Sequence, residues 1–190
     1  MSTYIGSNAK VSDSAQVYGW ALVSGSAQVC DSARVYGSAR VCGSARVSGS
    51  ALVYGSARVY DSARVYDSAV VYGSALVSGS AQVCGWARVY DSAVVCGKAK
   101  IAKTRDHIVL GPSIGESQRY ITAHRDSGIG IRVNAGCFSG SISEFRAAVA
   151  KTHAENFVQR TQYELFADLI EAHFALADLM DLEESQGGAA

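Results

Sequence analysis

Apolar residues recur every six positions from Ala9 to Thr104, without an insertion or a deletion. Alanine opens each unit, a β-branched aliphatic residue follows two positions later, and usually Gly or Asp and then Ser close it. Residues two apart on a strand point to the same side, while Gly, Asp and Ser suit tight corners. The pattern therefore predicts one short strand and one corner in each of 16 hexads (96 residues divided by six). It excludes a helix, whose apolar positions recur near every 3.6 residues.

A small residue two positions before a large aliphatic one, as in Ala15 with Val17 or Ala51 with Val53, resembles the hexapeptide-repeat proteins. That resemblance implies a mainly β fold, the left-handed parallel β-helix, in which three hexads close one coil of 18 residues. Residues 1–104 would then form about five coils, with Ala and Val inside. We expect a domain boundary near residue 104, where the repeat ends.

The outward positions fall on three faces when the chain is sorted by 18. One face aligns a tyrosine from each coil, and Arg34 and Arg88 lie in the neighbouring row. The predicted row of tyrosines is Tyr18, Tyr36, Tyr54, Tyr72 and Tyr90. Stacked rings would stabilise a sheet, or the row could bind a protein partner. Base stacking is a third reading, but Leu52 and Val70 in the Arg34 row disfavour nucleic acid.

Residues 105–190 lose the repeat and predict an α+β module. Strands are expected at about 107–110, 118–124 and 129–134, forming a small antiparallel sheet over the last coil. Ser141 and Glu144 have the spacing of a capping box, which predicts a helix at about 142–154. A longer helix is expected at about 157–182.

The longer helix has a wide apolar side, which favours self-association into a dimer or trimer. We expect the contact to form along one line of side chains. These are Tyr163, Phe166, Ile170 and Phe174.

Residues 105–175 also resemble a C-terminal module of unknown function in bacterial and phage proteins. The matching residues are Gly111-Pro112, Thr122, Ile131-Arg132-Val133, Gly136-Cys137-Phe138-Ser139-Gly140, Glu144-Phe145, Val149 and Thr152-His153. The module usually has Gly-Ser-Arg where this chain has Gly115-Glu116-Ser117. The resemblance suggests a phage origin and brings no activity with it.

Charge and cysteine content indicate the compartment in which the protein is expected to act. Residues 1–104 have a net charge of +5 (ten Lys/Arg, five Asp) and residues 105–190 of −5 (seven Lys/Arg, twelve Asp/Glu). No apolar stretch long enough for a membrane span and no signal peptide is evident, so we expect a cytoplasmic protein. All five cysteines are expected to be free thiols, and no spacing typical of a metal site occurs. We expect no metal and no cofactor.

Enzymatic function is the main alternative. Many hexapeptide-repeat proteins are acyltransferases with a histidine on a loop, yet residues 1–104 contain no histidine and no insertion. The weak catalytic candidates lie elsewhere. His107, beside Asp106, could be a general base. Cys137 lies in the segment Gly-Cys-Phe-Ser-Gly and could be a nucleophile activated by His124 or His153. A structural role is the simpler interpretation of both His107 and Cys137.

We therefore expect a non-enzymatic scaffold or protein-interaction protein that forms homo-oligomers. A phage protein of this kind could bind and block a host protein, for example in a defence system. Two alternatives stay open: a divergent acyltransferase, and a small-ligand or nucleotide binder at a subunit interface.

Overall fold

A computed structural model describes residues 3–12, 14–113 and 119–187 of the chain. It divides into two compact units. One comprises residues 1–104 with 125–128, and the other comprises residues 105–124 with 129–190. Residues 115–117, where the motif of the similar module differs, lie outside the described residues.

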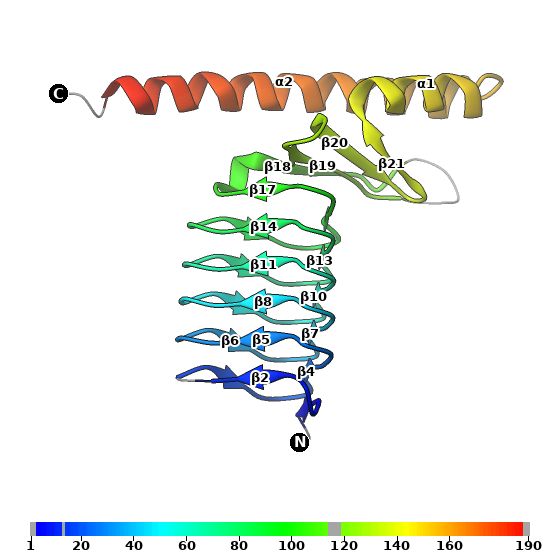
Figure 1. The fold of residues 1–190 in the computed structure, drawn as a ribbon. Helices are drawn as coiled ribbons and strands as arrows, with labels where there is room; N and C mark the ends of the chain where they lie inside the picture. Colours follow the sequence, from blue (N-terminus) through cyan, green and yellow to red (C-terminus); the bar gives the residue numbers. More distant parts are fainter. Residues whose placement is uncertain (1–2, 13, 114–118, 188–190) are drawn as a thin grey trace. The chain divides into compact units, whose positions relative to one another are not determined.

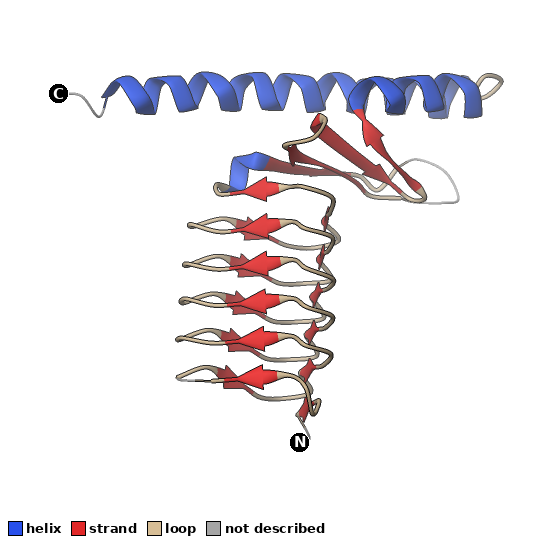
Figure 2. Cartoon of the chain, viewed as in Figure 1, coloured by secondary structure: helices blue, strands red, loops and turns tan. Residues whose placement is uncertain are grey.

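The first unit is a solenoid of two-residue parallel strands, one in each hexad and a further strand, β1, before the first hexad (Figure 1). Figure 2 shows how short these strands are beside the turns that connect them. The strands are β1 Tyr4–Ile5, β2 Lys10–Val11, β3 Gln16–Val17, β4 Leu22–Val23, β5 Gln28–Val29, β6 Arg34–Val35, β7 Arg40–Val41, β8 Arg46–Val47, β9 Leu52–Val53, β10 Arg58–Val59, β11 Arg64–Val65, β12 Val70–Val71, β13 Leu76–Val77, β14 Gln82–Val83, β15 Arg88–Val89, β16 Val94–Val95 and β17 Lys100–Ile101.

Every strand pairs with the strand three hexads away, which confirms the period of 18. Val35 of β6, for example, lies opposite Val53 of β9. Three parallel sheets result: sheet A from β1 to β16, sheet B from β2 to β17 and sheet C from β3 to β15. The solenoid therefore has about five coils, as predicted, and the left hand of the coils stays a prediction from the resemblance.

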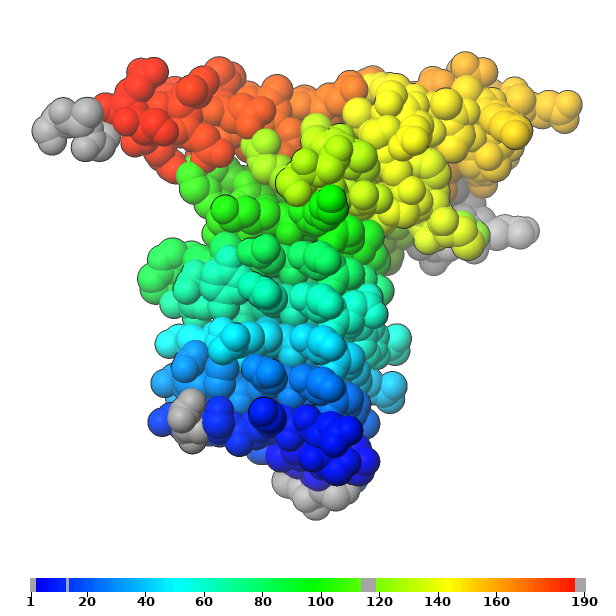
Figure 3. All heavy atoms as spheres, viewed as in Figure 1, coloured from blue at the N-terminus to red at the C-terminus, as the bar shows by residue number. Residues whose placement is uncertain are grey.

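The solenoid core consists of the repeated alanines and valines. Each inward residue from Ala21 to Ile101 is at most 1% exposed. Because alanine is small, the three inward valines of a coil can approach one another, and close packing follows from only two side-chain types. In the space-filling view the coils form successive layers, since each pairs only with its neighbours (Figure 3).

The corners need a left-handed backbone conformation, and this explains the choice of Gly or Asp. Gly49 has φ +67°, and a Cβ atom there would lie 2.8 Å from the backbone nitrogen of Asp67 in the next coil. Asp31 adopts φ 61° at a corner, and its Oδ2 accepts a hydrogen bond of 2.8 Å from the Gly49 N–H. Aspartate tolerates this conformation better than most residues do.

The second unit contains a four-stranded antiparallel sheet, in the order β18–β19–β20–β21. Its strands are β18 His107–Leu110, β19 Ile121–Asp126, β20 Gly130–Ala135 and β21 Phe138–Ser141. The last residues of β19 belong to the solenoid unit by their contacts: Asp126 Oδ2 accepts a hydrogen bond of 3.0 Å from the Lys98 N–H.

Sequence analysis predicted three of these strands and missed β21. The missed signal is a two-residue hairpin turn, Gly136-Cys137, between the paired residues Ala135 and Phe138. Gly136 has φ +61° at the first turn position, as a type II′ turn requires. Phe138–Ser141 is short, and three of its four residues are glycine or serine, so its composition did not indicate a strand.

Two helices follow, α1 Ile142–Thr152 and α2 Phe157–Gly187. The capping box is confirmed: Glu144 N–H donates to Ser141 Oγ at 3.3 Å, and Ser141 N–H donates to Glu144 Oε2 at 2.7 Å. The Ser141 N–H most strongly, and then the Ser141 hydroxyl, which donates to Glu144 Oε2 at 2.8 Å, lower the pKa of Glu144. Helix α2 continues five residues past the predicted end, because Arg105 forms ion pairs with Asp181 and Glu184 there.

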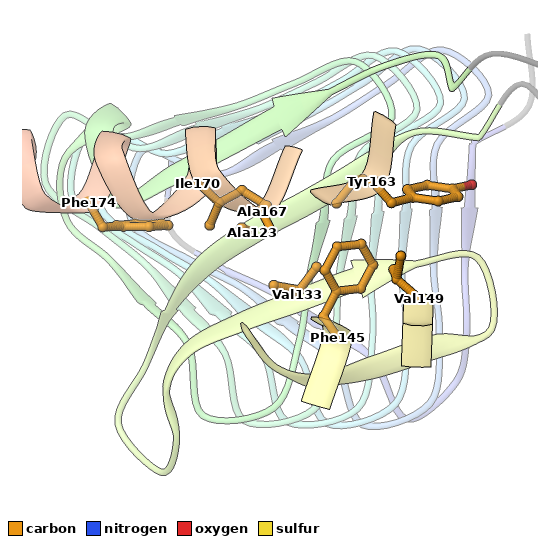
Figure 4. Close-up of a cluster of buried hydrophobic side chains, with 9 residues drawn as sticks. Ala123, Val133, Phe145, Val149, Tyr163, Ala167, Ile170 and Phe174 are labelled. Carbon is orange, nitrogen blue, oxygen red and sulfur yellow. The ribbon is translucent and has the colours of Figure 1, made fainter. Parts of the chain in front are cut away.

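Sheet and helices share one apolar core, with Phe145 and Val149 from α1 and Ile170 and Phe174 from α2 (Figure 4). Their placement corrects the predicted self-association line of α2. Tyr163, Ile170 and Phe174 are buried in the module's own core, and Phe166 packs against it. Tyr163, Ile170 and Phe174 are therefore not accessible to a second copy, whereas Phe166 is only half-buried.

Candidate functional site

The tyrosine row of sheet C forms a continuous stack. Tyr18, Tyr36, Tyr54, Tyr72 and Tyr90 follow one another with centroid separations of 5.0, 4.9, 5.2 and 5.5 Å. The first three rings are nearly parallel, and the last pair is inclined by 20°. Partial burial, followed by the neighbouring Tyr54 and Tyr18, raises the pKa of Tyr36. The stack itself stabilises the sheet, and its outer edges remain accessible.

Exposed arginines accompany this stack. Arg34 and Arg88 lie in the row beside the tyrosines, and Arg40 and Arg58 lie in register on sheet A. Within the described ranges, none of these four arginines forms an ion pair with a carboxylate. The solenoid surface therefore carries arginines that no carboxylate of the described residues pairs with.

A shallow hollow of about 300 Å³ lies on sheet B, between the in-register Arg46 and Arg64. Tyr66 donates a hydrogen bond of 3.1 Å to Gln82 Oε1 at its edge. A hydrogen bond with Cys84, then burial, raises the pKa of Tyr66 to about 12. Asp31 and Asp67 also line the hollow, so its charge is mixed and it is a weaker anion site than the arginines alone suggest.

Helix α2 has a second apolar stripe on the side opposite its buried one. Leu165, Leu169, Leu176 and Leu179 are between 49% and 62% exposed. With Ala172 they alternate in steps of four and three residues, which is the spacing of a coiled-coil seam. Sequence analysis noticed these leucines only as a widening of the apolar side, since periodicity alone does not say which of two stripes faces the core.

The histidine candidates prove to be largely internal. His107 and His124 lie opposite each other on β18 and β19, and both are buried. His124 Nε2 lies 3.2 Å from Asn134 Nδ2, and His173 Nε2 lies 2.9 Å from the Arg105 carbonyl oxygen. Burial favours a structural role for both His107 and His124, and the contact with Asn134 adds to it for His124.

Cys137 lies at the tip of the β20–β21 hairpin, where it is exposed. It lines a cavity of about 200 Å³ together with His153, so the structure brings this candidate pair to one cavity. His124, the other suggested activator, does not line it. The His153 ring stacks on Tyr163 with a centroid separation of 5.2 Å. Arg119, which sequence analysis did not single out, also lines the cavity.

The described residues contain neither a metal-binding cluster nor a membrane-spanning helix. Across residues 3–12, 14–113 and 119–187, no group of three or more His, Cys, Asp or Glu side chains is placed to hold a metal ion. All five cysteines are free. None of the described helices is long and apolar enough to span a membrane.

The comparison with protein families supports the fold of the solenoid. A family model described as the YdcK beta solenoid repeat matches residues 15–31, 27–43, 39–55, 57–73 and 81–97. No curated protein and no solved structure matches the chain. The matched stretches all lie in the solenoid and each is one residue shorter than a coil. Repeat match and coil geometry together identify a repeat β-solenoid protein.

Proposed function

We propose that this protein is a non-enzymatic scaffold that assembles through α2 and presents its solenoid surface to a protein partner. The observation that carries the proposal is the exposed leucine stripe of α2. Contiguous exposed apolar surface of this kind marks interaction sites. The uninterrupted hexads, which leave no loop for a catalytic group, support a scaffold over an acyltransferase.

The occupant of the stripe is a second copy of this chain. Its seam comprises Val158, Leu165, Ala172 and Leu179 in one row, with Leu169 and Leu176 in the other. The same stripe on two copies is self-complementary, as a symmetric interface requires. Coiled-coil packing of this seam gives a dimer or a trimer.

Charge at the borders of the seam is compatible with self-pairing. Asp168 is the only Asp, Glu, Lys or Arg at the eight positions that flank the seam, and it already forms an ion pair of 2.8 Å with Arg146. The flanking positions also include Phe166, Met180 and Leu182. Two copies can therefore approach without placing like charges opposite each other, which would destabilise the pair.

Light scattering of the full chain tests the assembly. Wild type should have two or three times the chain mass of 19.9 kDa, and Leu169→Glu with Leu176→Glu should be monomeric, because two buried carboxylates without partners are costly. Ala147→Glu with Ala150→Glu adds the same charge to exposed positions of α1 and should leave the mass unchanged. A monomeric wild type at high concentration would refute the assembly.

The surface for the partner is the tyrosine stack with Arg34 and Arg88 beside it. Tyrosine and arginine are enriched where proteins bind each other. The resemblance of the module to bacterial and phage proteins supports a partner in a bacterial cytoplasm, such as a host defence protein.

A pull-down from such a host, with mass spectrometry, tests this surface. A protein retained by wild type should be lost with Arg34→Gln and Arg88→Gln. The matched control is Arg40→Gln with Arg58→Gln on sheet A, which removes the same charge from another face. Equal loss with both pairs would contradict the assignment to sheet C.

A further inference from the structure

We propose that the cavity beside Cys137 binds a small carboxylate with a flat apolar body, of the size of an aromatic acid. All the residues that line the cavity belong to the C-terminal module, and none of them is a seam residue of α2. Its walls come from the β20–β21 hairpin, both helices and Arg119. Three properties define its ligand: the size of the cavity, its aromatic floor and the guanidinium of Arg119.

The size of the cavity favours a small ligand group. Its volume of about 200 Å³ is below the roughly 300 Å³ at which sites for drug-sized molecules usually begin. The cavity therefore suits a group with one ring and a small substituent.

The floor of the cavity is built from aromatic rings. Phe138 and Phe145 have a centroid separation of 5.5 Å with planes inclined by 53°, and Phe145 meets Tyr163 edge to face at 6.1 Å. Val149 completes the floor and, like Phe145 and Tyr163, is almost fully buried. Figure 4 shows Phe145, Val149 and Tyr163 converging from the two helices. Buried rings held in these orientations favour a flat aromatic body over a flexible chain.

Arg119 supplies the charge. A Cβ atom on Gly136 would overlap the Arg119 guanidinium, so the glycine of the hairpin turn leaves the space in which this side chain lies. Within the described part of the chain, Arg119 forms no ion pair. The planar guanidinium matches a carboxylate with two parallel hydrogen bonds. An exposed arginine that meets no carboxylate of the described residues, at the edge of an apolar cavity, points to an anionic ligand group.

The helix end that lines the cavity fixes the orientation of the ligand. Thr152 and His153 lie at the C-terminal end of α1, where the helix carries partial negative charge. A carboxylate is disfavoured there and favoured beside Arg119. The ring of the ligand then lies over Phe145 and Tyr163, with its far edge toward Thr152 and His153.

Titration of the full chain with benzoate, followed by NMR, tests the proposal. Benzoate should give saturable shifts of module resonances at millimolar concentration. Benzamide, which keeps the ring without the charge, and acetate, which keeps the charge without the ring, should each bind at least tenfold more weakly. Arg119→Gln should weaken benzoate binding by about ten- to a hundredfold, because hydrogen bonds between charged groups contribute that much. Arg119→Lys should lie between, since it keeps the charge and loses the fork.

Cysteine alkylation locates the site independently. Cys137 lines the cavity and is exposed, whereas Cys30 lies on the solenoid. Saturating benzoate should slow the alkylation of Cys137 and leave Cys30 unchanged, as read by mass spectrometry.

Arg34→Gln is the matched control for the loss of one arginine and should bind benzoate like wild type. Circular dichroism of Arg119→Gln must match wild type for its loss to count. Unchanged benzoate binding by a folded Arg119→Gln, equal binding of benzamide, or no saturable binding of benzoate would each overturn the proposal.

Discussion

In the solenoid each inward valine lies in register with a valine of the next coil, as Val35 does with Val53. In the C-terminal module the core instead brings together Val133 from the sheet, Phe145 from α1 and Ile170 from α2. The solenoid thus repeats one nearest-neighbour interaction, and its stability grows as a sum over coils. The module has a single core whose parts come from distant positions. A damaged coil should therefore weaken its neighbours, whereas the loss of one core ring should weaken the whole module.

The strongest test of this difference is truncation of a core side chain in each unit. Phe174→Ala should lower the free energy of unfolding of the module by about 3–5 kcal/mol, and Val71→Ala should cost the solenoid about 1–3 kcal/mol, since it removes two methyl groups. Calorimetry should show each variant moving one transition. A single transition that moves with both variants would show that the two units unfold together.

Substitution of a corner glycine should give the next largest loss in the free energy of unfolding. Gly49→Ala adds a strained φ of +67° and a Cβ atom 2.8 Å from the Asp67 backbone nitrogen, so we expect a loss of more than about 2 kcal/mol. Gly130→Ala in the module is the matched control: its φ is +77°, yet nothing lies within 4 Å of the added atom. It should cost only the backbone strain, about 1–2 kcal/mol. Equal losses in urea unfolding would mean that coil spacing adjusts freely.

Loss of the α1 cap should have a moderate effect, confined to the module. Ser141→Ala should cost about 1 kcal/mol at neutral pH. Because the hydrogen bonds from Ser141 lower the pKa of Glu144, their stabilisation is present above the unfolded pKa near 4.3 and is lost as pH falls through the folded pKa. The difference between wild type and Ser141→Ala should therefore narrow at pH 3. Glu144→Gln cannot titrate, so it should lose only the pH-dependent part of the stabilisation that the capping box gives the module.

The smallest expected effect concerns the tyrosine stack. Tyr54→Leu removes two stacked pairs, worth roughly 0.2–1 kcal/mol each, and the leucine restores part of that. The pKa of Tyr36 is raised in the folded protein. The stabilisation that neutral Tyr36 gives the solenoid is therefore complete below the unfolded pKa near 10, and it is lost as pH rises through the folded pKa. The melting temperature of the solenoid should fall above pH 10. Phenylalanine at all five stack positions should reduce that fall, and an unchanged fall would assign it to other groups.

Periodicity determined how much of this fold could be predicted. The inward and outward rows of the solenoid follow from a strict period, and so does the alignment of the tyrosines. In the module, β18 and the capping box at Ser141 carried clear local signals. Strand β21 did not, since its identity depends on pairing with β20 across Gly136-Cys137.

The candidate sites were harder to predict for a physical reason. Helix α2 has two apolar stripes, and only the packing of Tyr163 and Ile170 against the sheet decides which one stays exposed. The cavity joins Arg119, Cys137 and His153 from three separate segments. No sequence period connects these residues, so Arg119 could not be recognised before the hairpin was placed.

The 18-residue register has a consequence for how the length of this protein can change. Removal of residues 51–68 would delete three hexads, bring Tyr36 next to Tyr72, and restore all three sheets with one coil fewer. Removal of a single hexad would instead shift each later row onto a different face and divide the tyrosine stack between two sheets. The solenoid can therefore be shortened or extended only in steps of one coil of 18 residues if the surface pattern on each face is to be preserved.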